Sequence, residues 1–68
     1  MNELQQTEKR IVSAYERIQK QRELIRRLGR HRRNARLIAS AEELLGVMQD
    51  ICKQLRLRRK FIQHRRSH

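Results

Sequence analysis

Residues 4–28 read LQQTEKRIVSAYERIQKQRELIRRL, and the seven-residue spacing within this stretch decides the fold. One row of side chains recurs every seven residues and a second row follows three residues later: Leu4, Ile11, Ile18 and Ile25, then Thr7, Ala14, Gln21 and Leu28. Such rows are the a and d positions of a heptad repeat, which buries one seam of a helix against another helix. The pattern predicts a helix over about residues 3–28.

Both ends of this helix carry boundary signals. Asn2 can act as the N-cap, and Gln5 stands three residues later, in the capping-box position. Gly29 follows Leu28 directly and suits the position after a helix end, where φ is positive. We therefore expect a connector over about residues 29–34.

The second half of the chain repeats the pattern. Its two rows are Leu37, Leu44 and Ile51, then Ala41, Met48, Leu55 and Ile62. Further apolar residues widen this stripe on both sides: Ile38, Leu45 and Cys52 on one, Val47 and Phe61 on the other. The rows predict a second helix over about residues 35–63, followed by a basic tail at residues 64–68. Asn34 is preferred to Ser40 as its cap, because a start at Ser40 would leave Leu37 and Ile38 in a loop.

An all-α, antiparallel two-helix hairpin in a single domain, 1–68, accommodates both patterns. The stripe of the second helix is too broad for one neighbouring helix, and 68 residues make only a small core. We therefore expect a homodimer in which two hairpins form a four-helix bundle. The residues expected in its core or dimer contact are Leu4, Ile11, Ile18, Ile25, Leu37, Ala41, Leu44, Leu45, Met48, Ile51 and Leu55.

Two polar side chains interrupt these rows. Gln21 could be a register device inside the bundle or could lie at its edge and reach water, and the sequence leaves both open. Arg58 follows Leu37, Leu44 and Ile51 in their row, so we expect the bundle to loosen after Leu55.

The composition argues against several classes of protein. A single cysteine cannot build a disulfide scaffold or a cysteine-rich zinc site, and no apolar run approaches a membrane span. The first ten residues contain no apolar segment typical of a secretory signal. His64 and His68 lie four residues apart but have no third ligand nearby, so we predict neither metal nor cofactor. Cys52 is expected to be a buried small hydrophobe, which leaves no evident catalytic group. A lone cysteine also fits a reducing compartment, so we expect a cytoplasmic or nucleoid-associated protein.

Charge is the strongest functional signal. Eighteen Lys and Arg oppose seven Asp and Glu, which gives a net charge of +11. The cations gather around the connector and near the C-terminus, about 40 Å apart along a 26-residue helix. Arginine outnumbers lysine fourteen to four, and its planar fork suits phosphate. The predicted anion-binding residues are Arg26, Arg27, Arg30, Arg32, Arg33, Asn34, Arg36, Arg56, Arg58, Arg59, Lys60, Arg65 and Arg66.

These clusters favour a non-enzymatic protein that contacts the phosphate backbone of duplex nucleic acid, largely without sequence specificity. Tyr15 and Phe61 are the only aromatic residues, too few to stack single-stranded bases. The heptads support an alternative, a module that docks an acidic helical protein. A lesser alternative places Phe61 and Ile62 at an anionic membrane surface. The sequence does not separate DNA from RNA, and the basic charge could also be a solvated surface.

The residues ERIQKQRELI at 16–25, followed by Leu28, carry a resemblance to known proteins. They resemble a pattern found in small uncharacterised bacterial proteins, E-R-I-x-x-Q-R-x-L-I-x-x-L, in which a polar turn with Gly and His precedes A-x-x-L-L. Gly29 and His31 correspond to that turn, and residues 41–45 to the second motif. The resemblance implies a short helical hairpin and carries no known function.

Overall fold

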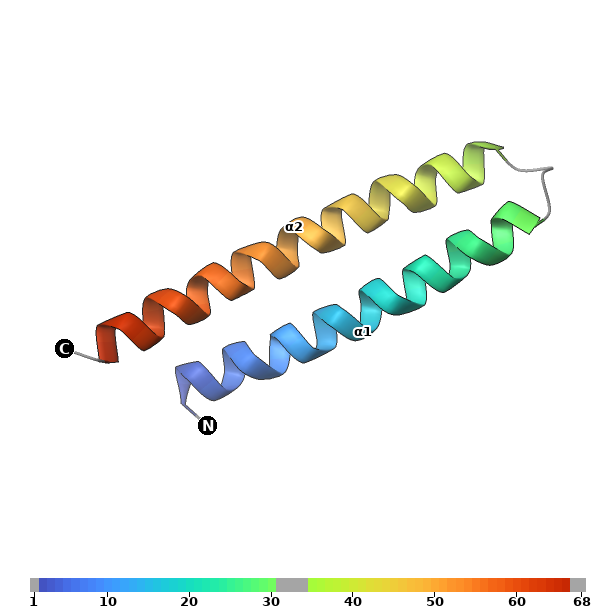
Figure 1. The fold of residues 1–68 in the computed structure, drawn as a ribbon. Coiled ribbons are helices and arrows are strands. Elements are labelled where there is room, and N and C mark those ends of the chain that lie inside the picture. The colour runs from blue at the N-terminus through green and yellow to red at the C-terminus, as the bar shows by residue number, and fades with distance from the viewer. Residues whose placement is uncertain (1, 31–34, 67–68) are drawn as a thin grey trace.

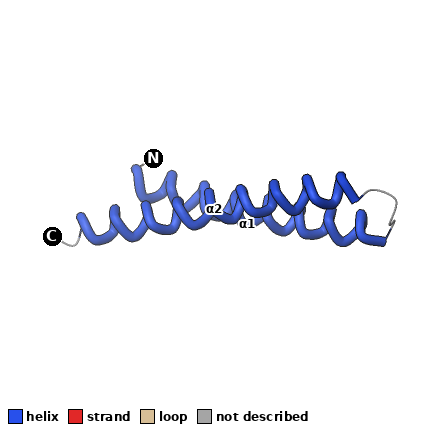
Figure 2. The backbone as a smooth tube through the Cα atoms, turned by 90° about the horizontal axis from the view of Figure 1, so that it is seen from above, coloured by secondary structure: helices blue, strands red, loops and turns tan. Residues whose placement is uncertain are grey.

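The computed structural model describes residues 2–30 and 35–66 and contains two helices, α1 (Glu3–Arg30) and α2 (Ala35–Arg66). Figure 1 shows them side by side and antiparallel, so that α1 begins and α2 ends at the same end of the molecule. The molecule measures 55 × 16 × 12 Å, and Figure 2 shows the helices crossing at a shallow angle along this long axis. The predicted all-α hairpin is confirmed.

A reciprocal pair of hydrogen bonds fixes the start of α1. The Gln5 backbone N–H donates to Oδ1 of Asn2 at 2.8 Å, and the Asn2 N–H donates to Oε1 of Gln5 at 3.3 Å. The predicted capping box is thus confirmed. It satisfies backbone donors that the first turn of a helix cannot pair internally.

The other helix boundaries differ partly from the predictions. Gly29 has no positive φ and lies inside α1, which continues to Arg30, so its prediction as a residue beyond the helix end is wrong. A helix start at Ser40 is also wrong, because α2 is already helical from Ala35. The preferred cap, Asn34, lies outside the described residues. At the other end α2 runs to Arg66, so the predicted basic tail continues the helix as far as that residue.

The seam between the helices confirms the rows of α1 and corrects one row of α2. Its buried apolar residues are Ile11 and Ile18 of α1 with Ala41, Cys52 and Ile62 of α2. The second α2 row against α1 consists of Ile38, Leu45 and Cys52. The predicted row of Leu37, Leu44 and Ile51 is about half exposed and lies beside the seam. Both rows are apolar, so their composition does not determine which one faces α1.

Gln21 and Ile62 settle two further expectations. Gln21 is buried at 8% exposure, and its Nε2 donates to the backbone oxygen of Ala41 across the seam at 2.8 Å. The edge position considered for Gln21 is therefore wrong, and the bond ties the two helices at one register. Ile62 is only 2% exposed, so the predicted loosening after Leu55 is also wrong. Arg58 belongs to the row of Leu37, Leu44 and Ile51, which lies beside the seam, so its side chain does not interrupt the packing between the helices.

Candidate nucleic-acid interface

The hairpin gathers the predicted cations at its two ends. The turn-end cluster consists of Arg26, Arg27, Arg30 and Arg36, where α1 ends and α2 begins. The tail-end cluster consists of Arg56, Arg58, Arg59, Lys60, Arg65 and Arg66 in the last third of α2. Arg32, Arg33 and Asn34, which were predicted to bind anions beside the start of α2, lie outside the described residues.

The turn-end cluster has few carboxylates near it in the sequence. No Asp or Glu occurs between Glu23 and Glu42, a stretch that contains six arginines. Arg26 lies 3.5 Å from the carboxylate of Glu23, and both side chains are more than half exposed. Such an exposed pair is weak, and salt screens it. The end of the molecule beyond Glu23 is therefore strongly positive.

Helix electrostatics explain part of this arrangement. Arg27 and Arg30 lie in the last turn of α1, where the helix dipole favours cations. Arg36 lies in the first turn of α2, which contains no acidic residue, and cations are disfavoured there. The stability of α2 therefore does not account for Arg36.

At the tail end, Glu3 ties the N-terminus of α1 to α2. Its carboxylate lies 2.6 Å from the guanidinium of Arg65 and 3.5 Å from that of Arg58. The hydrogen bond from Arg65 is the main reason that the pKa of Glu3 is lowered below its usual value, and Arg58 contributes to the same shift. Arg65 also lies over the ring of Phe61, 5.8 Å from its centroid. The ion pairs of Arg58 and Arg65 with Glu3 thus hold the start of α1 against the end of α2.

The remaining predicted cations divide by their surroundings. The guanidinium of Arg56 donates to the hydroxyl of Tyr15 at 3.5 Å, and Arg59 is half-buried against the seam. Among the predicted anion-binding cations that the structure describes, those that contact neither a carboxylate nor another polar side chain are Arg27, Arg30, Arg36, Arg59, Lys60 and Arg66. Except for the half-buried Arg59, these six side chains are exposed to solvent.

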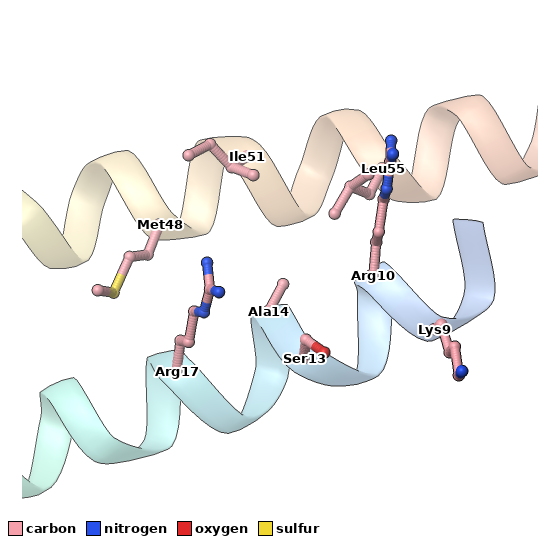
Figure 3. A pocket seen from close by; sticks show the side chains of 8 residues that line it. All are labelled: Lys9, Arg10, Ser13, Ala14, Arg17, Met48, Ile51 and Leu55. Carbon is pink, nitrogen blue, oxygen red and sulfur yellow. The ribbon is translucent and has the colours of Figure 1, made fainter. Parts of the chain in front are cut away.

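A groove on one face of the hairpin escaped prediction. It has a volume of about 540 Å³, and Figure 3 shows Arg10 and Arg17 reaching from α1 toward Met48, Ile51 and Leu55 of α2. Ala14 lies between the two arginines and leaves space because its side chain is small. The heptad pattern contains the residues that form this groove. Arg10 and Arg17 stand one position before the row of Ile11 and Ile18, and the small Ala14 stands in the other core row.

Other site chemistries find little support in the described residues. Across residues 2–30 and 35–66, no three His, Cys, Asp or Glu side chains group as metal ligands would. Cys52 is buried, as predicted. Within the same ranges, neither helix contains a segment long and apolar enough to cross a membrane. Comparison of the chain with protein-family models, curated proteins and solved structures gives no significant match.

Proposed function

We propose that this chain is a non-enzymatic, homodimeric binding protein that contacts the phosphate backbone of duplex nucleic acid, largely without sequence specificity. The observation that carries the proposal is the set of six cations at the hairpin ends that have no carboxylate partner among the described residues. Phosphate contacts supply most of the sequence-independent affinity for nucleic acid.

The length of the hairpin suits a duplex. Arg36 and Lys60 lie 24 residues apart on α2, which corresponds to about 36 Å along the helix axis. Successive turns of B-DNA are about 34–36 Å apart. A hairpin lying along a duplex can therefore bring its two ends to equivalent phosphates one turn apart.

The two aromatic residues fit backbone contact better than base recognition. The hydroxyl of Tyr15 accepts a hydrogen bond from Arg56 on the side of the hairpin, while Phe61 is 66% exposed near the tail end and its ring faces the guanidinium of Arg65. Recognition of single strands needs several aromatic platforms in series. We accordingly expect duplex to be preferred over single strands of the same length.

The proposed dimer, a four-helix bundle, is supported by the surface of the single hairpin. The hairpin exposes 5947 Å², whereas a compact monomer of its mass of 8.4 kDa exposes about 4,600 Å². A stable protein interface buries about 800 Å² on each partner. The excess surface is thus large enough for one such interface.

Fluorescence anisotropy with a labelled 20-base-pair duplex tests the proposed binding. Replacing Arg27, Arg30 and Arg36 together with Gln should weaken binding more than tenfold near 100 mM salt, because three phosphate contacts are lost. The matched control replaces Lys9, Lys20 and Arg22 with Gln, which removes the same charge from other parts of α1. Equal losses of duplex affinity in both variants would show that net charge alone, and not these three positions, determines binding. Failure of the wild-type protein to bind the duplex would refute the proposal.

The exposed apolar row of α2 favours a second candidate, a module that docks an acidic helical protein. Purification separates the two candidates. A nucleic-acid-binding protein should copurify with nucleic acid and show a high 260/280 absorbance ratio, which is easily seen because the chain has one Tyr and no Trp. A low ratio together with a stoichiometric acidic protein partner would favour the second candidate.

A further inference from the structure

We infer that a second copy of this chain packs on one long face of the hairpin, which we call the apolar face. It is defined by Leu24 of α1 and by Leu37, Leu44, Val47 and Ile51 of α2, which are between 40% and 53% exposed. The inference rests on the dimer of the proposed function and assigns that dimer to a surface.

The heptad positions show that these side chains share one side of the hairpin. Leu37, Leu44 and Ile51 each stand one position before the seam row of Ile38, Leu45 and Cys52, so they point roughly perpendicular to the plane of the two helices. Val47 lies next to Ile51 on the same groove wall. The apolar face is therefore continuous over two heptads of α2.

The opposite side of the hairpin is polar. Its flanking heptad positions are Glu8, Tyr15, Arg22 and Gly29 on α1 with Ala35, Glu42, Gln49, Arg56 and Gln63 on α2, of which only Tyr15 is a large side chain with apolar surface. Tyr15 and Arg56 hydrogen-bond to each other across this side. A partner that buries apolar surface therefore has one side on which to pack.

The side of the hairpin that carries the apolar face is large enough for a second copy. It measures 55 by 16 Å, on the order of 900 Å² and close to the roughly 800 Å² that each partner buries in a standard interface, and the row from Leu37 to Ile51 covers about 21 Å of its length. A second hairpin presents the same length and the same apolar row. Packing the two faces together gives an isologous interface, in which the same patch is used twice.

The groove between Arg10 and Arg17 sets the orientation of the copy (Figure 3). If the two turns lay at opposite ends, α1 would pack on α1 of the partner subunit and bring the arginine pairs of both copies together. Neither Arg10 nor Arg17 contacts a carboxylate in the described ranges, so that arrangement places four unpaired guanidinium groups within the interface. The turn-end clusters that a same-end dimer brings together lie instead at its solvent-exposed end, where water and salt screen their repulsion. With both turns at the same end, the arginine stems lie instead over the apolar row of the partner's α2. The inferred dimer has this second arrangement.

The oligomeric state tests the surface. Leu44→Glu with Ile51→Glu should convert the protein from about twice 8.4 kDa to a monomer in light scattering after size exclusion. The matched control, Val12→Glu with Leu57→Glu, changes two side chains of similar exposure on other sides and should remain dimeric. A monomeric wild-type protein at 100 μM, or equal dissociation of both double variants, would overturn the inference.

A second measurement does not depend on the folding of a disrupted monomer. In a Cys52→Ala background, a spin label attached through Gln6→Cys should give an intermolecular distance under about 25 Å if the turns lie at the same end. If the turns lay at opposite ends, the two labels would be more than about 30 Å apart, because each residue 6 lies far along the helix axis from the centre of the apolar face. That result would overturn the inferred orientation. A dimer that fails to bind duplex would refute the proposed function while leaving this interface intact.

Discussion

At the scale of single residues, Glu3 is the side chain whose ionisation most directly affects the hairpin. Its pKa is lowered chiefly by the hydrogen bond from Arg65, so its folded form binds protons less readily than its unfolded form. The stabilisation from Glu3 is therefore present above its unfolded pKa of about 4.5 and is lost as the pH falls through the lowered folded value.

We expect Glu3→Gln to lower stability at pH 7 and to reduce the loss of stability between pH 5 and pH 3. The measurement is urea unfolding followed by circular dichroism at several pH values. Glu16→Gln, which changes an exposed carboxylate without an ion pair among the described residues, is the control. An unchanged acid dependence in Glu3→Gln would show that its ion pairs do not survive in solution.

Gln21 is the residue that fixes the register of the seam. Gln21→Ala should lower the free energy of unfolding by about 1–2 kcal/mol, because a buried hydrogen bond to the Ala41 carbonyl is lost and a gap remains. Gln19→Ala, on the exposed side of α1, should change it by less than about 0.5 kcal/mol. Similar effects from both variants would contradict the buried bond.

At the scale of the helices, the position of α2 against α1 predicts which apolar side chains stabilise the hairpin. Ile62→Ala should cost about 2–4 kcal/mol, because Ile62 is buried at the far end of the seam. Leu57→Ala should cost less than about 1 kcal/mol, because Leu57 is half exposed and points away from α1. Urea unfolding of both variants gives the comparison, and a larger loss in Leu57→Ala would refute the observed register.

The periodicity of the sequence predicts the helices but only part of their packing. Heptad spacing and the capping box predict the start of α1 at residue 3 and the burial of Ile11 and Ile18. The prediction succeeds because the apolar stripe of α1 is narrow, so only one side of this helix can face α2. The stripe of α2 is wider than one neighbouring helix covers, so pattern alone does not show whether Leu44 or Leu45 faces α1. The ion pairs of Glu3 escaped prediction because they join residues about 60 positions apart.

At the scale of the whole molecule, the distance between the two basic ends predicts a dependence on duplex length. A 24-base-pair duplex reaches both ends, whereas an 8-base-pair duplex of about 27 Å does not span the roughly 36 Å between Arg36 and Lys60. After correction for the number of sites, anisotropy should show at least tenfold weaker binding to the short duplex. Equal affinities would mean that one end acts alone.

The dependence of duplex affinity on salt tests most directly the claim that unpartnered cations at the hairpin ends bind phosphates. With about six contacts from the one hairpin of the dimer that lies along the duplex, the logarithm of the association constant should fall linearly with the logarithm of salt concentration, with a slope near −5. Replacing Arg27, Arg30 and Arg36 with Gln should make that slope shallower by about 3. A flat response in the wild-type protein, or an unchanged slope in the variant, would contradict the account.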